Sequence, residues 1–167
     1  MRKYILTLFI LVSPASFGQT DAEIEEFFTD YVTSYAKYFD KKQGGDISIV
    51  LDHFADQTLQ VPPNVAPRLA DGHAVLGKGF SFFLNSLEKK GAAGIRWEKV
   101  QYVKLGQNHA LASNIANVYN QDGAVIDRRS SVYSLYKYED GWKIFMIQSI
   151  SPDQTPFIYR KESYIDD

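Results

Sequence analysis

The sequence contains no cysteine. This absence excludes disulfides, thiolate metal sites, cysteine nucleophiles and a lipid-modified cysteine anchor. Long apolar runs are also scarce, since the run from Tyr4 to Val12 is shorter than the ~20 residues that a membrane-spanning helix needs. Basic charge is not in excess, because 18 Lys and Arg stand against 20 Asp and Glu. We therefore expect neither a membrane nor a nucleic acid as partner, since nucleic acids require clustered Lys and Arg.

The first eighteen residues have the layout of a secretory signal peptide. Arg2 and Lys3 precede the apolar run, and small residues follow it. We expect cleavage between Gly18 and Gln19, with Ala15 as the alternative end point, and hence a secreted, periplasmic protein. Without Arg2 and Lys3, 16 basic residues remain against 20 acidic ones, a formal charge of −4.

Apolar and aromatic residues make up 45% and 14% of the chain, which is enough for one domain with a sizeable core. Helical spacing of these residues predicts three helices, from Thr20 to about residue 40, over 47–54 and over 74–90. Strand patterns separated by turn residues follow at 95–105, 109–119, 124–138 and 142–150, after a short strand at 58–61.

This order of elements favours an α+β fold in which three N-terminal helices cover one face of a mostly antiparallel sheet. We place the domain at residues 19–151, after a signal peptide at 1–18. Residues 152–167 then form an irregular C-terminal extension.

The last two hairpins decide which side chains face the helices. Tight turns at Asp122-Gly123 and Asp140-Gly141 would fix the register, because side chains alternate between the two faces of a sheet. One face then carries small alanines beside isolated polar groups, the composition of a ligand pocket. The other face is bulkier, and we expect it to form a homodimer through the two sheets. A β-bulge would exchange the two faces for one strand.

Four segments carry a resemblance to a known family: FFTDYVTSYAKYFDKKQGGD, VLDHFADQTLQVPP, DGHAVLGKGFSFFLNSL and DRRSSVYSLYKYEDGWKI. In order and spacing they resemble the nuclear transport factor 2-like superfamily, in particular its SnoaL-like branch, over residues 21–151. The resemblance implies a cone, in which a strongly curved sheet wraps around the helices and encloses a pocket, and frequently a homodimer. It leaves the function open, because this fold carries isomerases, dehydratases, cyclases and plain binding modules.

The pocket face suggests which residues bind a ligand. We expect a small molecule that is apolar or bears a carboxylate or carbonyl, with Arg129 as its charged anchor. Tyr133, Asn114 and Gln148 would add hydrogen bonds from the same face. Alternatively, Arg129 pairs with Asp127 at the end of the sheet, and the two amides satisfy backbone groups.

Two aromatic residues, Tyr35 and Trp97, are candidate walls of the pocket, because aromatic side chains combine large area with a polar tip. Ordinary core packing is the alternative for both. His53 lies beside Asp52, but adjacent helical residues point about 100° apart and cannot form a dyad directly. We therefore interpret His53 as structural.

Two further functions remain open. Resemblance to ketosteroid isomerase implies an enzyme in which a carboxylate such as Asp127 acts as base, while Tyr133 or Arg129 stabilises an oxyanion. A protein-interaction module would instead use the tail FIYRKESYIDD or the bulky sheet face. No pair of histidines or carboxylates has metal-ligand spacing on one element, so we expect neither a metal nor another cofactor.

Overall fold

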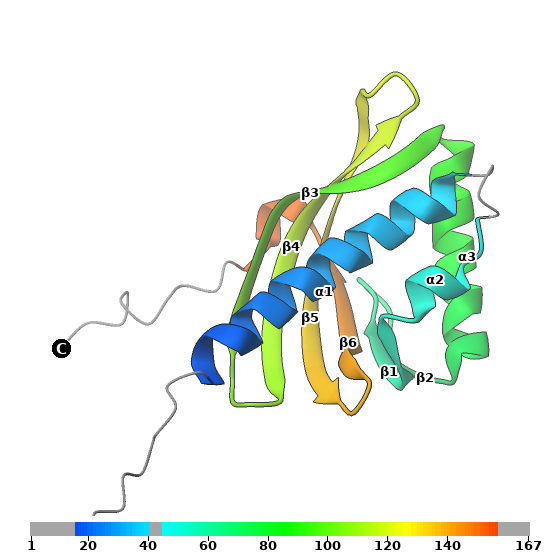
Figure 1. Cartoon of the computed structure of the whole chain (residues 1–167). Helices are drawn as coiled ribbons and strands as arrows, with labels where there is room; N and C mark the ends of the chain where they lie inside the picture. Colours follow the sequence, from blue (N-terminus) through cyan, green and yellow to red (C-terminus); the bar gives the residue numbers. More distant parts are fainter. Residues whose placement is uncertain (1–15, 41–44, 157–167) are drawn as a thin grey trace, which may run out of the picture.

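Figure 1 shows the computed structural model of the chain, which describes residues 16–40 and 45–156. The helices are α1 (Ser16–Phe39), α2 (Ser48–Leu51), α3 (His73–Lys89) and the short 3₁₀ helix η2 (Pro152–Gln154). The strands are β1 (Phe54–Val61), β2 (Arg68–Asp71), β3 (Ala92–Lys104), β4 (His109–Asn120), β5 (Val125–Tyr138) and β6 (Gly141–Ile150). The predicted α+β architecture is confirmed.

The six strands form one curved, open sheet in the order β2-β1-β6-β5-β4-β3. All neighbours are antiparallel except β1 and β6, which run parallel. In Figure 1, α1 crosses the concave side of the sheet, and α3 stands beside β1 and β2. The helices and the concave sheet face therefore enclose the interior of a cone.

Helix α1 owes its position to a stripe of apolar residues at helical spacing. Ile24, Phe27, Phe28, Tyr31 and Tyr35 are all buried against the sheet and α2. The helix begins at Ser16, one turn before the predicted start, and so includes the last three residues of the predicted signal peptide. The rest of that peptide, residues 1–15, lies outside the described residues, and its cleavage stays a prediction. Within the described ranges, no helix is both long and apolar enough to cross a bilayer.

The region between α1 and α3 differs from its prediction. The second helix ends at Leu51 rather than Phe54, and Phe54 already begins β1. Strand β2 was not predicted, because its four residues follow Pro67 and are too few to show a pattern. It pairs with β1 as a sheet edge, with Gln60 opposite Arg68.

The predicted β4–β5 register is correct from His109 to Val118, because an extra residue in β5, Ile126, offsets a loop that is one residue longer than the predicted turn. Ala116 opposes Arg129 and Ala112 opposes Tyr133, as predicted. In β5–β6 the turn lies at residues 139–140 rather than 140–141, so that the predicted pairs are wrong and only the predicted faces hold, as far as Ile144. Leu135 opposes Ile144 while Ser134 opposes Met146, so Phe145 is an extra residue that forms a bulge. Beyond this bulge, the faces of β6 are exchanged.

Candidate functional site

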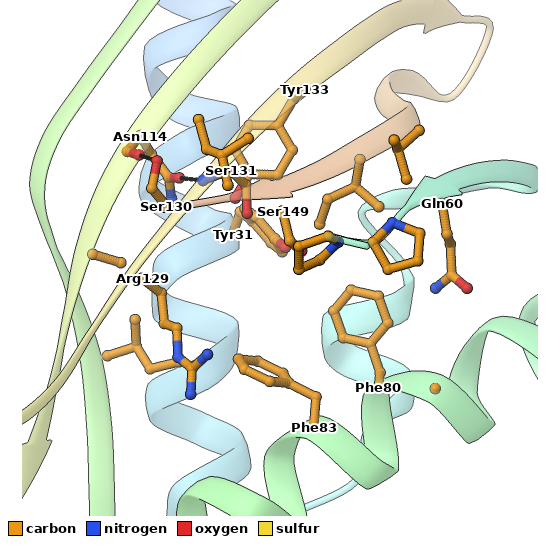
Figure 2. A pocket seen from close by; sticks show the side chains of 18 of the residues that line it. Tyr31, Gln60, Phe80, Phe83, Asn114, Arg129, Ser130, Ser131, Tyr133 and Ser149 are labelled. Carbon is orange, nitrogen blue, oxygen red and sulfur yellow. Dashed lines mark hydrogen bonds between the residues drawn. The ribbon is translucent and has the colours of Figure 1, made fainter. Parts of the chain in front are cut away.

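A cavity of about 330 Å³ lies between α1, α3 and the concave face of the sheet. Figure 2 shows its polar residues from β4, β5 and α1 on one side and the phenylalanines of α3 on the other. The volume is at the lower end of the range for small-molecule sites. Its apolar walls are formed mainly by Phe80, Phe83, Ile95, Trp97, Pro62 and Ile147.

Three tyrosines form the buried polar part of the cavity. Tyr31 and Tyr35 lie one helical turn apart on α1, and their hydroxyls are 2.7 Å apart. Tyr133 comes from β5, with its ring 6.1 Å from that of Tyr31. All three side chains are at most 5% exposed. Their hydroxyls therefore lie in a largely buried environment, where hydrogen bonds are stronger than in water.

Burial keeps these tyrosines neutral. It raises the pKa of Tyr133 to about 12, although hydrogen bonds with Ser131, Tyr31 and Asn114 act in the opposite direction. Burial also raises the pKa of Tyr31 and Tyr35 well above the ordinary value for tyrosine. At neutral pH each hydroxyl can donate one hydrogen bond and accept others, but none is a base.

Asn114 joins the tyrosines to the backbone of the sheet. Its Oδ1 accepts a hydrogen bond of 2.8 Å from the backbone N–H of Ser131 on β5. The side chain is 3% exposed and lines the cavity. Asn114 therefore satisfies a backbone group, as the alternative prediction stated, and it also lines the cavity.

Arg129 lines the cavity and belongs to a cluster of charges. Its Nη2 donates to Oδ2 of Asp127 at 2.7 Å, and Nζ of Lys90 donates to the same oxygen at 2.8 Å. The guanidinium also lies over the ring of Phe83, 5.7 Å from its centroid. Burial raises the pKa of Asp127, but hydrogen bonds from Lys90, the Arg128 backbone and Arg129 outweigh it and lower the pKa overall. Asp127 is thus an ionised partner of two cations.

A family model for NTF2-like proteins (DUF6841) matches residues 22–152. The chain belongs to this NTF2-like family. The SnoaL-like branch within the superfamily stays a prediction. No curated protein matches the chain.

Solved structures support the fold of this NTF2-like protein. A Nostoc punctiforme protein of unknown function with a cystatin-like fold has a TM-score of 0.58 and 18% identity, over 79% of this chain and 91% of that one. An NTF2-like protein from Novosphingobium aromaticivorans has a TM-score of 0.61 and 13% identity, over 81% and 84%. A ketosteroid isomerase-like protein from Erwinia carotovora atroseptica has a TM-score of 0.56 and 17% identity, over 81% and 100%. At these identities the likeness shows the fold alone.

The NTF2-like fold brings five of the six predicted ligand-binding residues to the cavity wall, namely Tyr35, Trp97, Asn114, Arg129 and Tyr133. Their roles toward a ligand stay predictions. Trp97 also has a structural role, because its Nε1 donates to the backbone oxygen of Phe28 at 2.9 Å and ties α1 to β3.

The expectation that Gln148 faces the cavity is wrong. The bulge at Phe145 places Gln148 opposite Val132, on the outer face of the sheet. Ile147 and Ser149 take its place in the cavity wall. Asp127 does not line the cavity either, since it is engaged by Lys90 and Arg129.

Several lining residues were missed from the sequence. Tyr31 repeats the helical spacing of Tyr35, and Phe80 and Phe83 share a helical face, so periodicity could have found these three. Gln60 and Arg68 could not be found in this way, because β2 was not predicted.

Acidic groups and histidines do not line the cavity within the described part of the chain. The ionisable lining residues there are the three tyrosines, Arg68 and Arg129. Residues 16–40 and 45–156 also contain no group of three His, Asp or Glu side chains placed to hold a metal ion. The described cavity thus offers hydrogen bonds, apolar area and positive charge.

Proposed function

We propose that this NTF2-like protein binds a small, largely apolar molecule in the cavity between α1, α3 and the sheet. The observation that carries the proposal is the cavity of about 330 Å³, whose aromatic walls surround the buried hydroxyls of Tyr31, Tyr35 and Tyr133. An apolar hollow with few, fixed polar groups is the usual composition of a small-molecule site.

The side chains that could fill the space are small or turned away. Ala116, Ser131 and Ser149 face the cavity from the sheet, and Gly79 faces it from α3. The bulge in β6 directs Met146 to the outer face, where it opposes Ser134. The small residues on both sides keep this hollow open, and its volume and composition support a small-molecule site.

The enzyme alternative has less support from the site. General acid–base catalysis needs a group that exchanges a proton near neutral pH within reach of the ligand. Asp127 is held ionised by Lys90 and Arg129, and the cavity tyrosines have raised pKa values. The ketosteroid isomerase-like relative shares the fold at 17% identity, which carries no residue roles across.

Secretion is a second part of the proposal. Its support is the sequence of residues 1–18, in which two basic residues, an apolar run and small residues follow one another. Expression of the full chain in a Gram-negative host, followed by intact mass measurement of the periplasmic protein, tests it. A mass corresponding to a start at Gln19 supports cleavage, and retention of Met1 in a cytoplasmic fraction contradicts it.

The ligand proposal is tested with the neutral fluorescent probe N-phenyl-1-naphthylamine, which brightens in apolar sites. We expect saturable binding with one site per chain. Ala116→Leu fills the cavity from β4 and should weaken this binding by about tenfold or more, because overpacking an occupied site costs about 1–3 kcal/mol. Ala74→Leu adds the same atoms at an exposed position of α3 and should have no effect. Equal binding by both variants would show that the probe does not occupy the cavity.

A further inference from the structure

Gln60 and Arg68 form a polar pair where the cavity meets a second hollow. They oppose each other on β1 and β2, and Nε of Arg68 donates to Oε1 of Gln60 at 2.8 Å. Both residues line the cavity together with Gly79. The same three residues also line a groove between β2 and α3, whose other walls include Leu69, Val75 and Phe82. The pair therefore stands at the junction of the two spaces.

The hydrogen bond within the pair determines what it can offer to a ligand. Oε1 of Gln60 is the single side-chain acceptor of the two residues, and Arg68 already occupies it. The groups that remain are the Nη donors of Arg68 and the amide N–H donors of Gln60. A site that presents several N–H donors and a positive charge selects an anionic acceptor.

Among residues 16–40 and 45–156, no acidic side chain forms an ion pair with Arg68. In the described part of the chain, its hydrogen-bond partner is the neutral amide of Gln60. On the opposite side of the cavity, Arg129 and Lys90 share the single carboxylate of Asp127, which leaves that cluster with one excess positive charge. The two cationic walls together favour a ligand that carries negative charge.

Gly79 gives the pair its place against α3. A Cβ atom at this position would lie 3.2 Å from Nη2 of Arg68 and 3.6 Å from Nε2 of Gln60. Glycine inside a helix costs about 1 kcal/mol relative to alanine. The missing side chain thus lets the guanidinium and the amide lie against the helix, directly beside the cavity.

We propose that Gln60 and Arg68 form an anion-binding site and that the ligand of the cavity is an amphiphilic monocarboxylate. Its carboxylate accepts hydrogen bonds from Arg68 and Gln60, and its apolar body extends between Phe80, Trp97 and the tyrosines. This inference rests on the proposed function and specifies the class of ligand. A planar carboxylate matches the geometry of a guanidinium, which can donate two parallel hydrogen bonds to it.

Displacement of N-phenyl-1-naphthylamine by matched acids and amides tests the inference. The competitors are 4-phenylbutyrate against 4-phenylbutanamide and decanoate against decanamide, which differ in charge but hardly in size. We expect each acid to displace the probe from the wild-type protein about tenfold more strongly than its amide, because hydrogen bonds to charged groups are the stronger ones. This preference should decrease with rising salt concentration.

Three variants separate the candidate anchors. Arg68→Gln should remove the preference for the acid and leave the affinity for the amide unchanged. Gly79→Ala, which favours the helix but displaces the guanidinium, should reduce the preference. Arg96 of β3 lies over the ring of Tyr119 and does not line the cavity, so Arg96→Gln should keep the full preference.

Equal displacement by acid and amide in the wild-type protein, with normal binding of the probe, would overturn the inference and leave the proposed function standing. A preference that survives Arg68→Gln and disappears in Arg129→Gln would also overturn it, since Arg129 would then be the anchor. Failure of the probe itself to bind in the cavity would remove the proposed function and the inference together.

Discussion

The hydroxyl groups of Tyr31 and Tyr35 share a hydrogen bond of 2.7 Å across one turn of α1, in the wall of the cavity. Tyr31 is fully buried and Tyr35 is 5% exposed. Bulk water therefore cannot replace either partner. The pair satisfies two buried polar groups, and it also fixes the directions of the remaining donor and acceptor sites.

Removal of either hydroxyl tests this coupling. Tyr31→Phe and Tyr35→Phe should each lower the free energy of unfolding by about 1–3 kcal/mol, because each removes the hydrogen bond between two buried hydroxyls. The double variant should cost clearly less than the sum of the two, since it leaves neither hydroxyl of the pair behind. Urea unfolding measures all three, with Tyr136→Phe as control, because Tyr136 is 41% exposed. Additive losses would contradict the coupling.

Much of the fold could be predicted because the patterns in the sequence are long. Helices α1 and α3 and the four long strands repeat apolar residues over many positions, and the β4–β5 register was predicted from a tight turn at Asp122-Gly123. The loop is one residue longer than that turn, but the extra residue Ile126 in β5 restores the predicted register. That register alone placed Asn114, Arg129 and Tyr133 on one face, and all three line the cavity.

The errors arose where one residue or a few residues decide the outcome. A single extra residue, Phe145, exchanges the faces of β6 and replaces Gln148 by Ser149 in the cavity wall. A bulge leaves little trace in composition, because both faces of β6 are apolar. Strand β2 has only four residues, so the pairing of Arg68 with Gln60 became visible only in three dimensions.

The ion pairs of Asp127 predict a dependence of stability on acid. Because its pKa is lowered in the folded state, its contribution is complete above the ordinary pKa of about 3.9 and disappears as the pH falls through the lowered value. Asp127→Asn should cost up to about 1 kcal/mol at pH 7, since Lys90 and Arg129 are half exposed, and less at pH 3. Urea unfolding at both pH values measures this difference.

The same variant, Asp127→Asn, should bind N-phenyl-1-naphthylamine like the wild-type protein. Loss of probe binding would instead place Asp127 in the site.

His53 predicts a second dependence on pH, nearer to neutrality. Its ring lies 5.5 Å from that of Phe27 and 5.2 Å from that of Tyr31, and burial lowers its pKa below the ordinary value of about 6.5. The unfolded chain therefore binds a proton first, so stability is complete above pH 6.5 and decreases below it. We expect a lower unfolding free energy at pH 5.5 than at pH 7.5. His53→Gln should flatten this difference, while Asp127→Asn should retain it.

We propose that the outer face of the sheet forms the interface of a homodimer. Leu111, Val132 and Phe145 are half-buried there, and Tyr136 and Tyr138 are 41% and 43% exposed. Contact with a second copy would bury these side chains, and a stable interface needs about 800 Å² from each partner.

Light scattering after size exclusion should therefore give twice the chain mass. Val132→Glu should shift the protein to monomer, because a buried carboxylate without a partner is costly. Val65→Glu, at a position that is 65% exposed, should leave the dimer intact. A wild-type protein that stays monomeric at tens of micromolar would show that this face serves another partner or none.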